Sequence, residues 1–262
     1  MHGRDRAGRA EPGAREARST LTGMLVAAAV CPCPPLLVPE VAAGAAHELD
    51  PARAACADAL GVLAASRPDL LIVTGPAGPA ERGLYPAGSP GTFAAFGVDL
   101  AVRLGDPAAG SSAPDRPLPA SLAVGAWLLA RARWSGAPVE GLGVEEPLSA
   151  DRCAEAGREL ALRADRVALL VMGDGSACRT VKAPGYLDER AVDFDAAAFR
   201  ALGAADPAAL GALDEELARE LRVAGRAPWQ VLAGAARGTG LAGRLLYEDA
   251  PYGVGYAVAA WS

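Results

Sequence analysis

Three short runs of purely apolar residues constrain the fold of this chain more than any other feature. They cover residues 25–30, 70–73 and 167–172, and each is followed closely by a turn rich in glycine or proline. Such runs are typical of strands that are buried on both faces of a parallel sheet. Signals that begin helices stand between or after the runs, at Asp50-Pro51, Ser149 and Asp206-Pro207.

This alternation predicts an α/β fold: a single three-layer α/β/α domain with a mostly parallel central sheet. We expect the three apolar runs to be neighbours or near neighbours in that sheet. Weaker patterns predict further strands near residues 98–102, 138–144, 241–247 and 255–261. Further helices are expected over residues 120–134, 149–164, 228–237 and, as one amphipathic helix, 206–221.

Composition excludes several classes of function. The chain has 262 residues, a net charge of -6 and no stretch that combines Lys and Arg with interleaved aromatics, so nucleic-acid binding is not expected. No apolar run approaches the roughly 18–20 residues that span a bilayer, so no membrane segment is expected. Five widely spread cysteines do not form a disulfide framework in a domain of this size and fit a reducing cytoplasm.

The first 23 residues differ from the rest of the chain. They are rich in arginine and have almost no large apolar side chains, so they are expected to form a disordered leader. Met24 is an alternative start for the protein. The ordered domain is therefore expected to cover residues 24–262.

The turns that follow the three apolar runs are the expected place of a binding site, because ligands of parallel sheets usually bind beyond the carboxyl ends of the strands. The first turn contains Cys33, the second contains Gly75 and Gly78, and the third is Gly173-Asp174-Gly175-Ser176. We expect Cys33, Asp174 and the second turn to converge. The alternative for the third turn is local turn chemistry, with Asp174 accepting backbone hydrogen bonds.

Two of these turns resemble those of a known family. The Cys31-Pro32-Cys33-Pro34-Pro35 turn and the Gly173-Asp174-Gly175-Ser176 turn are similar to the LigB-like members of the class III extradiol ring-cleavage dioxygenase superfamily. The resemblance covers residues 24–262. It implies cleavage of catechol-type rings with Fe(II) and dioxygen, although the related Memo-like branch keeps the fold without that established reaction.

The residues at the family's histidine positions argue against this iron chemistry. The resemblance places an iron-binding histidine where Cys33 stands, a second after the 70–73 run, where the Gly75–Pro79 stretch has none, and an acid/base histidine where Cys178 or Arg179 stands. The only histidines are His2, in the leader, and His47. A site with two histidines and one carboxylate needs two converging imidazoles, which this monomer does not supply.

Three functional hypotheses follow. In the first, the chain is a LigB-like protein with a lost or remodelled iron site that binds a small ligand or a partner protein. In the second, it is an enzyme with Asp174 and Cys178 as catalytic residues and Cys33 as a metal ligand, with zinc as a possible ion. In the third, it is an active dioxygenase whose iron is held in an unexpected way, for instance with histidines from a partner chain.

The candidate ligand-binding residues are five small residues of the second and third turns: Gly75, Gly78, Gly173, Gly175 and Ser176. The 252–256 segment, with Tyr252 and Tyr256, is either a pocket lining or a turn with aromatic anchors. A homo-oligomer or a complex with a partner chain is also compatible with the sequence, and the substrate is not predicted.

Overall fold

The computed structural model describes residues 23–107 and 116–262, so the expected leader lies outside the described residues except for Gly23. The main strands are β1 (Met24–Cys31), β2 (Leu70–Ala77), β3 (Gly83–Tyr85), β6 (Val139–Glu145), β7 (Arg166–Met172), β8 (Gly243–Asp249) and β9 (Tyr256–Trp261). The longer helices are α2 (Asp50–Ala65), α3 (Ala120–Arg131), α4 (Ala150–Ala161), α5 (Arg190–Ala204) and α8 (Arg226–Ala235). Shorter helices are α1 (Pro39–Ala42), α6 (Pro207–Gly211) and α7 (Glu215–Glu220).

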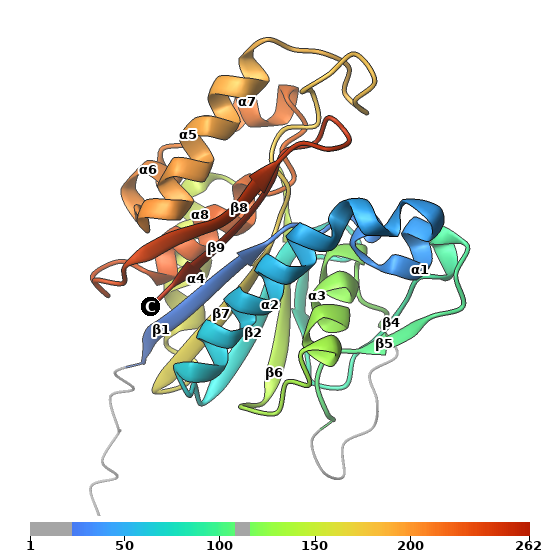
Figure 1. Cartoon of the computed structure of the whole chain (residues 1–262). Helices are drawn as coiled ribbons and strands as arrows, with labels where there is room; N and C mark the ends of the chain where they lie inside the picture. The colour runs from blue at the N-terminus through green and yellow to red at the C-terminus, as the bar shows by residue number, and fades with distance from the viewer. Residues whose placement is uncertain (1–22, 108–115) are drawn as a thin grey trace, which may run out of the picture.

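These strands form one seven-stranded sheet with the order β3-β6-β2-β7-β1-β9-β8 (Figure 1). Strands β6, β2, β7 and β1 are parallel, whereas β3 and β9 are antiparallel to their neighbours β6 and β1. The predicted strands 25–30, 70–73 and 167–172 are therefore the adjacent strands β1, β2 and β7, and the expected mostly parallel sheet is confirmed.

Helices cover both faces of the sheet, which confirms the three-layer α/β/α architecture (Figure 1). Alternate residues of each strand enter two separate cores. In β1, Ala27 and Ala29 enter the core under α2 and α3, while Ala28 and Val30 enter the core under α4, α5 and α8. Burial of every residue from 27 to 31 explains why this run has no polar member.

Two expected elements differ from the structure. The run 98–102 contributes only to β5 (Ala101–Arg103), which pairs with β4 (Pro90–Thr92) in a separate two-stranded sheet. The single helix expected over 206–221 is divided into α6 and α7. Asp214 is the reason for the division, because its side chain accepts a hydrogen bond from the Leu217 amide at 2.8 Å and begins a new helix.

Two helix starts also differ in detail. Asp50 is the first residue of α2 rather than its N-cap, and its carboxylate pairs with Arg53 at 2.7 Å. Ser149 occupies the N-cap position of α4, but its side chain makes no capping bond. Glu215 of α7 accepts from the Ala150 amide at 2.7 Å in its place, so a distant residue caps this helix. Within the described residues, no helix combines the length and apolarity that crossing a membrane requires.

Candidate functional site

The carboxyl ends of β1 and β7 meet at Cys33 and Asp174. The Cys33 amide donates a hydrogen bond to Asp174 Oδ1 at 2.8 Å, and the Gly173 amide donates to the Cys31 carbonyl at 3.0 Å. Both residues follow adjacent parallel strands, so the fold itself brings them together. The expected convergence of Cys33 and Asp174 is confirmed.

Burial perturbs the acid–base properties of this pair. Asp174 is half-buried, and desolvation raises the pKa of its carboxyl from 3.8 to about 7, although hydrogen bonds from Cys33 oppose the shift. Desolvation also raises the pKa of the Cys33 thiol well above its ordinary value, and the nearby Asp174 charge adds to the effect. The Cys33 thiol is therefore protonated near neutral pH. The Asp174 carboxyl, in contrast, titrates near neutral pH.

Tyr256, the first residue of β9, belongs to the same group. It is 2% exposed, and burial followed by the Asp174 and Cys33 charges raises the pKa of its hydroxyl. We call Cys33, Asp174 and Tyr256 the Asp174 cluster. Sequence reasoning identified the 252–256 segment but not Tyr256 itself as a site residue; its position at the start of a strand was the available signal.

The Asp174 cluster suits proton transfer and hydrogen bonding better than metal binding. A carboxyl with a pKa of about 7 can act as a general acid or base near neutrality. Iron or zinc would need more ligands, and across residues 23–107 and 116–262 no three His, Cys, Asp or Glu side chains are grouped to hold a metal ion. His47 is exposed in a 3-10 segment, Ala43–Leu49. The residues present do not fit the iron site that the resemblance implies.

The second turn was expected directly after residue 73, but β2 continues to Ala77, so Gly75 lies within the strand and only Gly78 follows it. The carboxyl end of β2 is at the same end of the sheet as that of β7, its parallel neighbour. Gly75 lies within β2, where an added Cβ would be 2.8 Å from Ser121 Oγ and 3.0 Å from Met172 Cβ. This glycine is needed for close packing of α3 on the sheet. Gly78 follows the strand, and its amide donates to Glu81 Oε2 at 3.1 Å.

Ser176 belongs to a second network of hydrogen bonds, which is buried, and Gly175 packs against it. The Ser176 amide and hydroxyl donate to the two carboxylate oxygens of Asp195 at 2.7 and 2.8 Å, and Arg179 Nη1 donates to the same carboxylate at 2.9 Å. Asp195 is 1% exposed and comes from α5. It anchors the third turn to that helix. Neither α5 nor a role for Asp195 was predicted from the sequence. The usable signal was an acidic residue among the inward positions of this amphipathic segment.

Cys178 does not join the Asp174 cluster. Its side chain is 2% exposed in the core under α4, α5 and α8, whereas Cys33 belongs to the opposite core. The Cys178 thiol lies 3.4 Å from the Leu221 carbonyl, and burial raises its pKa. A protonated, packed thiol is a small core group more than a nucleophile.

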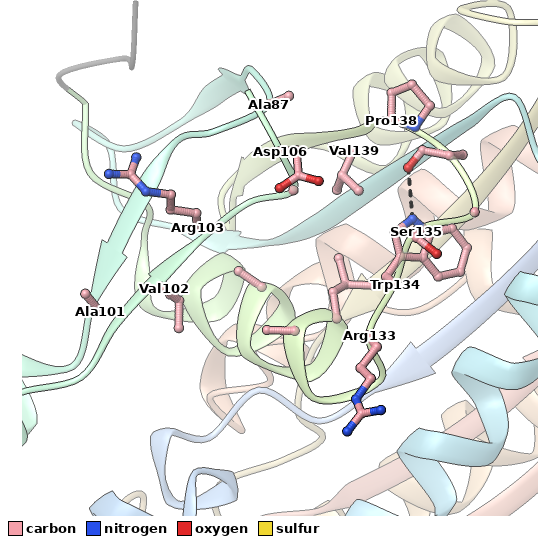
Figure 2. Close-up of a pocket in the computed structure, with 16 residues that line it drawn as sticks. Ala87, Ala101, Val102, Arg103, Asp106, Arg133, Trp134, Ser135, Pro138 and Val139 are labelled. Carbon is pink, nitrogen blue, oxygen red and sulfur yellow. Dashed lines mark hydrogen bonds between the residues drawn. The ribbon is translucent and has the colours of Figure 1, made fainter. Parts of the chain in front are cut away.

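A cavity of about 870 Å³ lies away from these residues, beside the start of β6 and the end of α3 (Figure 2). Trp134, Arg133 and Asp106 line it, and the Trp134 indole donates to the Ala137 carbonyl at 3.0 Å. None of the residues that we predicted to form a site contributes to its lining, and it lies at the opposite end of β6 from the carboxyl ends of the strands.

Comparison with known proteins supports the fold alone. No protein-family model matches the chain, and no curated protein matches it. The crystal structure of an uncharacterized protein from Escherichia coli K12, JW3007, is similar with a TM-score of 0.55 and 16% sequence identity. The similarity covers 90% of this chain and 99% of that one, so the whole domain has a counterpart of the same fold.

Proposed function

We propose that this chain is an extradiol-dioxygenase-like protein of the LigB-like type, whose iron site is lost and whose Asp174 cluster binds a small ligand. The Cys31–Pro35 and Gly173–Ser176 turns support the family assignment, and both lie at the carboxyl ends of neighbouring strands. The missing histidines and the absence of a grouped ligand set in the described chain argue against bound iron.

One observation carries the proposal. The Cys33 amide holds the Asp174 carboxyl at the strand ends, and burial gives that carboxyl a pKa of about 7. Near neutral pH, Asp174 would accept a hydrogen bond from a ligand hydroxyl when ionised and donate one when protonated. A phenolic or catechol-type compound supplies such hydroxyls on a flat apolar ring. We infer that ligands of this class bind without being cleaved.

The alternative function is a metal-dependent enzyme, either a dioxygenase or a zinc enzyme, that uses Cys33 and Asp174. The proximity of a thiol to a carboxylate favours it. It would require more ligands, and a partner chain could provide them.

Metal content and ligand binding of the purified full chain test the proposal together. We expect substoichiometric iron and zinc by elemental analysis, no tight one-to-one Fe(II) binding under anaerobic conditions, and no oxygen uptake with catechol or protocatechuate. Calorimetry should detect binding of catechol. Asp174→Asn should weaken it by about tenfold or more, because a charge-assisted hydrogen bond is lost. Asp58→Asn, on the exposed face of α2, is the matched control.

Stoichiometric Fe(II) with ring-opened product would replace this proposal with the dioxygenase alternative. Stoichiometric zinc that Cys33→Ser abolishes would favour the zinc enzyme. Equal catechol affinity in the Asp174 and Asp58 variants would remove the Asp174 cluster as the binding site.

A further inference from the structure

A second cavity, of about 630 Å³, lies beyond the carboxyl end of β6, between α7 and the start of α8. Pro147, Val223 and Ala224 give it an apolar lining, and Glu146, Arg222 and Arg226 are among its charged residues. Its volume is within the range of about 300–1,000 Å³ that is usual for small-molecule sites. No residue of the Asp174 cluster lines it.

Arg226 is a buried cation with one unused donor. Its side chain is 2% exposed, and its Nη1 donates to the Leu148 carbonyl at 2.6 Å and to Gln230 Oε1 at 3.0 Å. Its Nη2 donates to Glu146, through the backbone carbonyl and through Oε2 at 2.8 Å. The Nε–H group is buried and has no acceptor within the described part of the chain. A buried donor without an acceptor is unfavourable, so a ligand acceptor that reached it would be stabilising.

Among the described residues, the charges around the cavity leave one arginine without a carboxylate. Glu146 pairs with Arg226, and Glu216 pairs with Arg219. Glu215 caps α4 through the Ala150 amide. Arg222 is exposed at the cavity, and the hydrogen bond that the structure gives it is to a neutral acceptor, the Pro184 carbonyl, at 2.9 Å.

We propose that this cavity binds a small monocarboxylic acid with an apolar body, whose carboxylate pairs with Arg222 while its body packs on Pro147, Val223 and Ala224. Arginine suits this role because its planar guanidinium binds a carboxylate in a bidentate manner. The single negative charge matches the single cavity arginine that has no carboxylate partner in the described chain. The cavity shares no lining residue with the Asp174 cluster, although the amide of Gly225, next to Ala224, donates to the Asp174 carbonyl at 2.8 Å. The proposal does not rest on the function proposed for the Asp174 cluster.

Benzoate and its neutral analogue benzamide are suitable probes, because they differ in the carboxylate alone. We expect the full chain to bind benzoate one-to-one by calorimetry, and to bind benzamide at least about tenfold more weakly. Arg222→Gln should weaken benzoate binding about ten- to a hundredfold. Arg200→Gln should leave it unchanged, since Arg200 is an exposed arginine of α5 outside the cavity.

Ala224→Phe provides a second test, because the new ring would fill the cavity and should abolish benzoate binding. A thermal melt of each variant establishes that it is folded. The proposal is overturned if folded wild-type protein does not bind benzoate, if it binds benzamide equally well, or if Arg222→Gln and Arg200→Gln have the same effect. Loss of benzoate binding in Asp174→Asn but not in Arg222→Gln would also overturn it, because binding would then belong to the Asp174 cluster.

Discussion

Asp174→Asn should stabilise the protein at alkaline pH. Burial raises the pKa of Asp174 from 3.8 to about 7, so keeping this carboxylate ionised in the folded state costs free energy. The difference corresponds to about 4 kcal/mol once both the folded and the unfolded chain are ionised. Asparagine does not ionise, and its Oδ1 still accepts the hydrogen bond from the Cys33 amide.

The sign of the pH dependence follows from the raised pKa. Below about pH 4, Asp174 is protonated in both states and carries no penalty. As the pH rises towards about 7, the unfolded chain releases its proton first, so the free energy of unfolding falls and stays low above pH 7. Glu146, whose pKa burial also raises to about 7, acts in the same direction, so the variant should retain part of the slope.

Urea unfolding at pH 4.5, 6 and 8 measures this effect. We expect the variant to gain stability relative to wild type as the pH rises, with a difference of a few kcal/mol and at most about 4 kcal/mol at pH 8. Asp58→Asn, on an exposed position of α2, is the control and should follow wild type. If the effect of Asp174→Asn is the same at all three pH values, folding does not raise the pKa of Asp174 and the reasoning is wrong. A loss of stability that grows with pH would show that the ionised carboxylate is stabilising, which also contradicts it.

Three further substitutions test the surroundings of the site. Gly175→Ala should lower the free energy of unfolding by about 1–3 kcal/mol, because its Cβ would lie 2.7 Å from Asp195 Oδ1; urea unfolding measures this. Thr74→Val should be neutral or stabilising by up to about 1 kcal/mol in a thermal melt, because the buried Thr74 hydroxyl has no partner among the described residues. Cys33→Ser should leave the melting temperature nearly unchanged, since its backbone amide makes the contact with Asp174; a large fall would indicate that the thiol matters for packing.

The central strands were predictable because burial on both faces leaves a strong signal in the sequence. Residues 27–31 of β1 alternate between two cores, so polar residues are excluded at every position. The convergence of Cys33 and Asp174 followed from the same reasoning, because parallel neighbours end at the same edge of a sheet. Local pattern and topology were sufficient for both predictions.

Contacts between distant residues were not predictable in this way. The Asp195 carboxylate binds Ser176 at a separation of nineteen residues, and Glu215 caps α4 across sixty-five. Neither pairing leaves a periodic signal. The break between α6 and α7 was in principle readable, since Asp214 is a good N-cap, but the continuous leucine periodicity of this segment favoured one helix.

Cys33 contacts Asp174 through its backbone amide, so the identity of its side chain is a poor guide to function. The atom of Cys33 that meets Asp174 in the clearest geometry is its backbone nitrogen, which most residues at this position would supply. A histidine in its place would add one imidazole. On β2, which is separated from β1 by β7, Gly75 lies within the strand, and a Cβ there would meet Ser121 and Met172. A histidine at Gly75 would therefore require α3 to repack. We therefore expect that Cys33→His alone would not create an Fe(II) site in this chain.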